Sequence, residues 1–253
     1  MKIFVTGASG AIGRRLVPQL VAQGHEVTGT TRSPDNTATI ARMGARPIVL
    51  DGLDAEAVTR AVVAAEPEVV IHQMTSLAGG MDLKRFDEGF AMTNRLRTEG
   101  VDTLIRAARA AGARRLIAQS YAGLANIREG GPVKTEDDPY DPDPPQGMRE
   151  SVAAIRHLEA VVPAAEALEG LVLRYGPLYG PGTSLGEGGL YPELMHKRKF
   201  PIVGDGGGVW SFLHVDDAAS ATVAAVERGA AGIYNIVDDE PAPVAEWLPW
   251  LAE

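Results

Sequence analysis

The chain begins MKIFVTGASGAIGRRLVPQL (residues 1–20), and this stretch decides the fold. The run KIFV is typical of a β-strand, and the run RRLVPQL has the 3.6-residue apolar period of a helix. Gly7, Gly10 and Gly13 lie between them at a spacing of three. A glycine-rich turn from a strand into a helix leaves backbone N–H groups free at the helix N-terminus, where an anion such as a phosphate binds. The stretch therefore predicts a dinucleotide-binding site.

Each glycine has an expected role in such a site. Gly7 would permit the tight turn, Gly10 would let the backbone approach a pyrophosphate, and Gly13 would let the helix pack on the strand. The spacing is Gly-x-x-Gly-x-x-Gly, which differs from the Gly-x-Gly-x-x-Gly fingerprint. The alternative is a strand-turn-helix unit with a purely structural role.

Composition narrows the class of protein. The 253 residues suffice for one large domain, or for a domain with a smaller appendage. A net charge of −9 with no basic block argues against nucleic-acid binding, and the absence of cysteine excludes disulfides and thiolate metal sites. No signal peptide and no stretch of about 18 apolar residues is visible. We expect a cytoplasmic protein that acts on a small molecule, without a nucleic-acid, membrane or metal partner.

Short apolar strands alternate with helices, a pattern that predicts a parallel sheet with right-handed crossovers. The expected strands are residues 2–5, 26–31, 47–50, 68–71, 115–118, 171–174 and 233–236, and the expected helices are 14–20, 55–65, 93–111, 152–168 and 218–228. The fold class is therefore α/β, a doubly wound parallel sheet. We expect it to occupy residues 1–175, and residues 176–253 to form mainly a small substrate lobe, with Ala218–Asn235 partly returning to the sheet. Trp247 and Trp250 are expected to pack within this lobe.

The end of the second strand bears on the choice of cofactor. An NAD-binding unit carries an acidic residue there, which hydrogen-bonds the ribose 2′-hydroxyl. This chain has Thr31-Arg32-Ser33 instead, and a guanidinium binds a 2′-phosphate that a carboxylate would repel. We therefore favour NADP over NAD as the cofactor. The alternative is that Arg32 stacks on the adenine or lies on the surface.

Several segments together resemble the extended short-chain dehydrogenase/reductase family, also called the NAD-dependent epimerase/dehydratase family. They are VTGASGAIG (5–13), DGLD (51–54), VIH (70–72), Asn94, Leu173-Arg174, YGPG (179–182), HVDD (214–217) and GIYN (232–235). The resemblance covers essentially the whole chain. It implies a Rossmann domain with a small C-terminal substrate lobe, in proteins that are often homodimers.

The resemblance also assigns roles to particular residues. It implies that Ser9, Ala11 and Ile12 hold the pyrophosphate, and that Asp51 with Gly52 or Leu53 borders the adenine. It further implies that Met74 and Thr75 line the ribose and that Tyr175 to Pro177 face the nicotinamide. Asn94 would support the site.

The chain departs from the family in its acid–base residues. The family uses a Ser or Thr together with a Tyr four residues before a Lys, and the ammonium lowers the pKa of the phenol. None of the five lysines follows a tyrosine by four, and aligning Glu159 with a family glutamate puts Ser151 and Ile155 at the Tyr and Lys positions. Tyr121 falls at the Ser/Thr position with Ser120 beside it, and we expect one of these two hydroxyls to be the catalytic donor of a hydrogen bond or proton. The alternative for Tyr121 is a packing role or a place in the substrate wall.

Three other side chains remain alternatives for proton transfer. His72 and His157 are residues that titrate near neutral pH, although a single histidine is more often structural. Tyr140 lies in an acidic, proline-rich loop and reaches the substrate only if that loop folds inward.

We accordingly expect an NADP-dependent oxidoreductase that transfers hydride to or from a small carbonyl, hydroxyl or sugar-like substrate. Loss of the Tyr/Lys pair weakens acid–base catalysis by a factor of about 10²–10⁴ but does not prevent hydride transfer. Two alternatives are a catalytically inactive NADP(H)-binding sensor and a non-redox, epimerase- or dehydratase-like enzyme that uses the cofactor as a scaffold.

Overall fold

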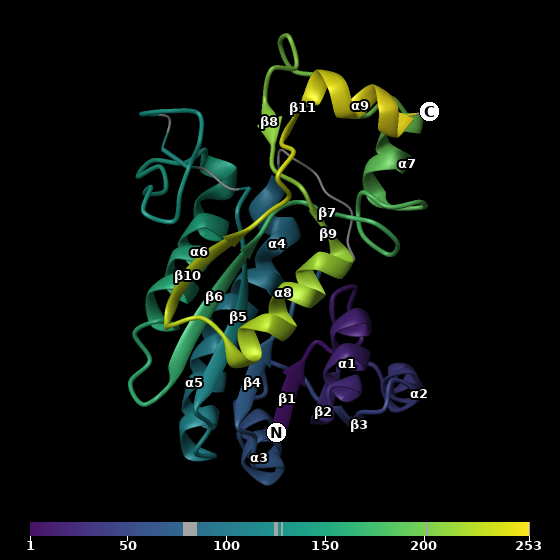
Figure 1. The fold of residues 1–253 in the computed structure, drawn as a ribbon. Helices are drawn as coiled ribbons and strands as arrows, with labels where there is room; N and C mark the ends of the chain where they lie inside the picture. Colours follow the sequence, from purple (N-terminus) through teal and green to yellow (C-terminus); the bar gives the residue numbers. More distant parts are fainter. Residues whose placement is uncertain (78–84, 124–125, 128, 201, 253) are drawn as a thin grey trace.

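The computed structural model describes residues 1–77, 85–123, 126–127, 129–200 and 202–252 of the chain. Throughout this part, every helix is too short or too polar to cross a bilayer. The molecule has a central sheet covered by helices on both faces, and a group of short elements at one end of it (Figure 1).

Seven strands of the described chain form the central sheet. They are β1 (Lys2–Thr6), β2 (Glu26–Thr31), β3 (Arg46–Val49), β4 (Val69–His72), β5 (Arg115–Tyr121), β6 (Glu169–Tyr175) and β10 (Gly232–Ile236). Their order is β3-β2-β1-β4-β5-β6-β10, and each neighbouring pair is parallel. The order reverses between β1 and β4, and ligands of such sheets bind beyond the carboxyl ends of the strands at this point. The expected doubly wound parallel sheet is confirmed.

Helices connect the strands. Those of the described chain are α1 (Gly13–Ala22), α2 (Thr37–Arg42), α3 (Ala55–Ala65), α4 (Phe86–Arg95), α5 (Val101–Ala110), α6 (Arg149–Val161), α7 (Leu190–His196), α8 (Val215–Glu227) and α9 (Val244–Ala252), with 3₁₀ turns at Pro34–Asn36 and Gln146–Met148. The helix expected at 93–111 begins earlier and is interrupted, because a π-helical segment, Leu96–Gly100, joins α4 to α5. The helix expected at 152–168 ends at Val161, two residues before Pro163, which has no N–H to continue the hydrogen-bond ladder.

Two apolar layers hold the sheet between the helices. Side chains alternate along each strand, so Ile3 and Val5 of β1 pack into the layer beneath α1 and α8, whereas Phe4 packs into the layer beneath α3, α5 and α6. All three side chains are at most 1% exposed. The continuous apolar character of KIFV, which predicted a strand, thus reflects burial on both faces.

The short elements lie mostly between β6 and β10, beyond the carboxyl ends of the strands (Figure 1). They are the helices α7 and α9 and the strands β7 (Leu178–Tyr179), β8 (Val209–Trp210), β9 (Leu213–His214) and β11 (Ala242–Pro243). β8 pairs with β11 antiparallel, and β7 pairs with β9 parallel. Since α8 and β10 lie among these elements in the sequence but complete the central sheet, the division into residues 1–175 and 176–253 stays a prediction.

An aromatic cluster forms the interior of this lobe. The Trp247 ring lies 4.8 Å from that of Trp210 and 5.5 Å from that of Phe212, between ring centroids. Trp247 therefore packs as expected, but the expectation for Trp250 is wrong, because its side chain is 76% exposed. A residue three positions further along a helix is rotated by about 60°, which carries the Trp250 ring past the edge of the cluster.

Candidate active site

The three glycines of the turn between β1 and α1 differ in how strongly the fold requires them. Gly7 has a φ of +75°, and a Cβ there would collide with the carbonyl group of Gln73. A Cβ on Gly13 would lie 2.6 Å from the carbonyl oxygen of Ala8, so helix and turn meet only because Gly13 has no side chain. A Cβ on Gly10 would meet only one atom within 4 Å, at 3.3 Å, and Gly10 is exposed. The fold itself therefore requires Gly7 and Gly13 more than Gly10.

Free amide groups surround Gly10. The backbone N–H groups of Ser9, Ala11 and Ile12 make no hydrogen bond within the described residues, and no side chain caps α1. The Ser9 hydroxyl donates to Thr31 Oγ1 at 3.0 Å, which joins this turn to the end of β2. Free donors at a helix N-terminus beside an open glycine fit a diphosphate group. The predicted pyrophosphate residues thus share one turn, and their binding role stays a prediction.

The end of β2 presents an exposed cation. Arg32 directly follows the buried Thr31 and makes no ion pair within the described residues. The Ser33 N–H donates to Thr31 Oγ1 at 3.2 Å, which fixes the backbone on either side of Arg32. The guanidinium is thus available to a ligand bound along the turn.

The predicted adenine and ribose residues follow the ends of β3 and β4, and Gly52 meets Met74 there. Asp51 is exposed, and its Oδ1 accepts a hydrogen bond from the Leu53 N–H at 3.0 Å. Gly52 is buried directly against the sulfur of Met74, so a larger residue there would displace Met74. Thr75 follows Met74 and is partly buried. The structure places these residues together at the ends of β3 and β4.

The residues predicted to face the nicotinamide separate into two groups. Tyr175 is 2% exposed, and its hydroxyl shares hydrogen bonds with Thr222 at 2.6 Å and with the Gln73 amide at 3.2 Å. Burial raises the pKa of Tyr175 to about 12. The Tyr175 side chain is therefore part of the protein interior, whereas Pro177 lines an open cavity.

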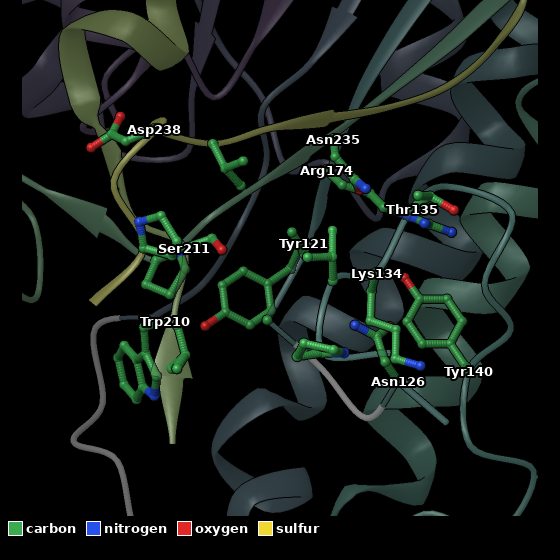
Figure 2. Close-up of a pocket in the computed structure, with 18 residues that line it drawn as sticks. Tyr121, Asn126, Lys134, Thr135, Tyr140, Arg174, Trp210, Ser211, Asn235 and Asp238 are labelled. Carbon is green, nitrogen blue, oxygen red and sulfur yellow. The ribbon is translucent and has the colours of Figure 1, made fainter. Parts of the chain in front are cut away.

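This cavity, of about 720 Å³, lies between the sheet and the lobe. It is lined by Tyr121, Ala122, Gly123, Asn126, Pro132, Val133, Lys134, Thr135, Tyr140, Arg174, Pro177, Val209, Trp210, Ser211, Asn235, Val237, Asp238 and Pro241. Figure 2 shows Tyr121 near its centre, with Trp210 and Ser211 on one side and Lys134 and Tyr140 on the other. The walls combine aromatic and aliphatic side chains with many polar and charged ones, among them Lys134, Arg174 and Asp238, and such a mixed concave site fits a polar small molecule.

Tyr121 is the predicted proton donor that faces this cavity. It ends β5, and its ring lies directly over the backbone of Gly123, where any side chain would collide with the phenol. Burial raises the pKa of Tyr121 far above its usual value of 10, and the charge of Arg97 opposes this in part. The phenol is therefore protonated across the physiological range and can donate a hydrogen bond or a proton.

Ser120, the other predicted catalytic residue, belongs to a buried network centred on Glu159. Glu159 Oε1 accepts hydrogen bonds from Ser120 Oγ at 2.6 Å, from the Tyr140 hydroxyl at 3.0 Å and from Arg174 Nε at 2.9 Å. Arg174 Nη2 also donates to Glu159 Oε2 at 2.6 Å, and both side chains of this ion pair are at most 8% exposed. The Ser120 hydroxyl is thus already used within the protein.

The acidic, proline-rich loop folds inward over the cavity. Tyr140 bonds Glu159, and its ring lies 5.2 Å from the guanidinium carbon of Arg174. Glu136 of the same loop accepts a hydrogen bond from the backbone N–H of Asn235 at 2.6 Å, and Arg156 Nη2 donates to the carbonyl of Asp141 at 2.7 Å. The loop is therefore tied to β10 and α6, and Tyr140 lines the site.

Sequence reasoning missed two cations in the cavity wall, Lys134 and Arg174. Lys134 donates to the Glu129 carbonyl and lies 3.8 Å from Asp138 Oδ1, with 18% of its side chain exposed. Lys134 does not fit the Tyr-x-x-x-Lys pattern, which requires the two residues to lie one helical turn apart. Lys134 lies in a loop between Glu129 and Asp138, and the sequence of this loop does not indicate that the lysine lines a cavity.

The positions that would hold the family's Tyr and Lys have a structural role in this chain. Ser151 is fully buried, accepts a hydrogen bond from Asn94 Nδ2 at 3.1 Å, and donates to Asp87 Oδ1 at 2.7 Å. Ile155 is fully buried and apolar. Asn94 Nδ2 donates to the Ser151 side chain, and the support of Asn94 for the site stays a prediction.

The two candidate histidines lie in different surroundings. His72 is fully buried at the end of β4, and burial lowers its pKa to about 4, so the ring is neutral at physiological pH. His157 Nε2 lies 2.8 Å from Asp102 Oδ1 in a partly exposed pair between α5 and α6. Neither lines the cavity.

Comparisons with known proteins agree with this arrangement. The model of the NAD dependent epimerase/dehydratase family matches residues 3–237. A 3-diazoavenalumate denitrifying reductase from a Streptomyces species is 50% identical over 100% of this chain and 81% of that protein. A 2-alkyl-3-oxoalkanoate reductase from Stenotrophomonas maltophilia is 29% identical over 97% of this chain and 73% of that protein. The structure of a Thermus thermophilus UDP-glucose 4-epimerase in complex with NAD superposes with a TM-score of 0.76, at 28% identity, over 100% of this chain and 82% of that one.

The sheet order, the glycine turn and these matches define the class: the chain belongs to the NAD-dependent epimerase/dehydratase family. Within it, the chain is an extended short-chain dehydrogenase/reductase-type oxidoreductase, an NAD(P)-dependent enzyme of the reductase/epimerase kind.

Proposed function

We propose that this chain is an NADPH-dependent reductase of a small carbonyl or related electrophilic substrate, and that Tyr121 is its proton donor. One observation carries the proposal: a protonated phenol faces a cavity of about 720 Å³ at the carboxyl ends of β5 and β6. Relatives with 50% and 29% identity are named reductases, which supports reduction over epimerisation.

The cofactor would lie along the carboxyl edge of the sheet, from the end of β2 to the cavity. We propose that the residues that hold it are Gly7, Ser9, Gly10, Ala11, Ile12, Gly13, Arg32, Asp51, Gly52, Met74, Thr75, Tyr175 and Pro177. Solved relatives carry NAD, and the choice of NADP for this chain rests on Arg32. Tyr175 would contribute through its backbone, because its side chain is in the interior.

The bound dinucleotide would supply a hydride to the electrophilic carbon of the substrate. Tyr121, which is protonated at neutral pH, would donate its phenolic proton to the oxygen that gains negative charge. Ser120 is the second candidate, although its hydroxyl must first leave Glu159. Trp210 and Pro177 would exclude water from one side of the reacting group.

Replacing Tyr121 with phenylalanine tests this function. We expect kcat for NADPH oxidation with a responsive carbonyl substrate to fall about 10²-fold or more, because the proton donor is lost while the ring remains. Stopped-flow absorbance of NADPH measures this, and fluorescence titration should show unchanged NADPH binding. Tyr234→Phe is the matched control, since the Tyr234 hydroxyl bonds the Ala230 carbonyl outside the cavity. Equal rates for Tyr121→Phe and the wild type would contradict the assignment.

The substrate panel should contain diazo compounds beside ketones and aldehydes, because the relative with 50% identity is named for a diazo substrate. A chain that binds NADPH but leaves the whole panel unreduced would favour the sensor alternative.

Replacing Arg32 with alanine tests the choice of cofactor. We expect the Kd for NADPH to rise by about 10- to 100-fold, since a charge-assisted hydrogen bond to the 2′-phosphate is lost, and the Kd for NADH to stay the same. Arg42→Ala, which removes another exposed arginine, serves as the control. If the affinity for both nucleotides falls equally, Arg32 does not select NADP.

A further inference from the structure

The first turn of α1 carries charge of the wrong sign for a helix N-terminus. Its second and third residues are Arg14 and Arg15, it holds no acidic residue, and no side chain caps it. The positive end of the helix dipole favours anions and disfavours cations. The chain gathers positive charge here although its net charge is −9. A bound anion would relieve this repulsion.

Arg14 folds back over the turn that precedes α1. Its Nε donates to the backbone carbonyl of Ser9 at 2.8 Å, and the residue is exposed. Its Nη1 and Nη2 atoms make no hydrogen bond and no ion pair within the described residues. The bond to Ser9 thus fixes the inner part of the guanidinium and leaves its outer N–H groups available to a ligand.

The Ser9 side chain joins this position to the end of β2. Its hydroxyl donates to Thr31 Oγ1 at 3.0 Å, and Thr31 Oγ1 also accepts from the Ser33 N–H at 3.2 Å. Arg32 lies between Thr31 and Ser33, is exposed, and makes no ion pair in the described part of the chain. Arg14 from the helix and Arg32 from the strand therefore flank one bridge of hydroxyl groups.

The carboxylates closest in the fold do not neutralise these two arginines. Asp35 follows Arg32 by three residues, and Asp51 follows β3, the neighbour of β2 in the sheet. Both carboxylates are exposed, and neither forms an ion pair with Arg14 or Arg32 among the residues that the structure describes. The two guanidinium groups thus keep their charge for a ligand.

A phosphate monoester suits two guanidinium groups better than one. Such a group carries a charge of about −1.5 to −2 at neutral pH and has three acceptor oxygens. Arg32 alone would leave roughly half of this charge uncompensated. A second guanidinium matches the charge and donates charge-assisted hydrogen bonds to further oxygens of the same group.

We propose that Arg14 and Arg32 together bind the 2′-phosphate of NADP, so that Arg14 is a second residue that selects this cofactor. This rests on the proposed function for the presence of a dinucleotide in the glycine turn. The diphosphate would use the free amides of the turn. Arg14, bonded to Ser9 on the side that meets β2, would face the adenosine ribose.

Two nucleotides that differ only in the 2′-phosphate test the proposal by calorimetry. We expect the Kd of Arg14→Ala for adenosine 2′,5′-bisphosphate to rise at least tenfold, and its Kd for 5′-AMP to stay within about twofold of the wild type. NADPH and NADH should show the same contrast. In Arg14→Ala combined with Arg32→Ala, the 2′-phosphate should add no affinity. Arg42→Ala, which removes an exposed arginine bonded to Thr39, should leave both Kd values unchanged.

Arg15 is the matched control for stability, because the protein itself holds its guanidinium. Its Nη1 and Nη2 donate to the carbonyl oxygens of Ala11 and Pro181 at 2.9 and 2.7 Å, and its Nε lies 2.6 Å from Asp216 Oδ1. In urea denaturation without nucleotide, we expect Arg15→Ala to unfold at clearly lower urea than the wild type. We expect Arg14→Ala to unfold at equal or higher urea, since it removes a cation from a helix N-terminus.

Four results would overturn the proposal. An equal loss of affinity for the bisphosphate and for 5′-AMP would place Arg14 at the diphosphate, and unchanged affinity for both would remove it from the site. A loss of stability as large as that of Arg15→Ala would assign Arg14 a structural role. A wild type that binds the two nucleotides equally would exclude a 2′-phosphate site. Because none of these measurements needs turnover, they assess Arg14 even if the wild type reduces no substrate and the proposed reductase function fails.

Discussion

Replacing Glu159 with leucine is expected to cost about 3–5 kcal/mol of stability, because it leaves the buried Arg174 guanidinium without its counter-charge. A loss of this size approaches the whole free energy of unfolding of many domains. The substitution also removes the acceptor of the Ser120 and Tyr140 hydroxyls, so the loop over the cavity loses one of its attachments. Urea denaturation followed by circular dichroism measures the change.

Two further variants test whether the broken Glu159–Arg174 ion pair causes the loss of stability. Glu150→Leu also removes a carboxylate from α6, but at an exposed position, and should shift the stability by less than about 1 kcal/mol. Glu159→Leu combined with Arg174→Met removes both charges and should recover part of the loss. If the double variant were less stable than Glu159→Leu alone, the pair would not be the reason for the destabilisation.

Replacing Gly10 with alanine is expected to abolish dinucleotide binding while leaving the fold intact. A Cβ at Gly10 meets only one atom within 4 Å in the protein, so the free energy of unfolding should change by less than about 1 kcal/mol. The same Cβ would occupy the space where a diphosphate approaches the free amides of Ser9, Ala11 and Ile12. We expect the Kd for NADPH to rise at least 100-fold, as measured by fluorescence titration or calorimetry.

Gly7→Ala gives the opposite pattern and serves as the contrast. Its Cβ would collide with the Gln73 carbonyl, and alanine tolerates a φ of +75° poorly, so this variant should lose several kcal/mol of stability or fail to fold. If Gly10→Ala bound NADPH as the wild type does, the glycine turn would not be the diphosphate site.

The sheet and its flanking helices could be predicted because they depend on local apolar patterns. The alternation seen in Ile3, Phe4 and Val5 appears in the sequence as one continuous apolar run, and burial on both faces is what produces it. The π segment could not be predicted in this way. One extra residue in a helical turn changes the apolar period too little to be seen, so residues 93–111 looked like one regular helix.

The candidate site was predictable only in part, for a similar reason. The glycine turn is contiguous in sequence, and its residues remain together in the structure. Glu159, Tyr140 and Arg174 come from three separate elements, and only the tertiary fold brings their side chains into hydrogen-bond contact. Tyr175 shows a second limit of prediction from sequence. A position at a strand end indicates nearness to the site, but it does not tell which way the ring points, and this ring bonds Thr222 in the core.

The pairing of β10 with β6 has a practical consequence for protein engineering. Cutting the gene after Tyr175 would discard an edge strand together with α8, which covers one face of the sheet. A minimal cofactor-binding module would therefore have to be made by excision and religation, with Gly176 joined through a short linker to the segment before α8. Simple truncation would expose the backbone of β6 as a new, aggregation-prone edge.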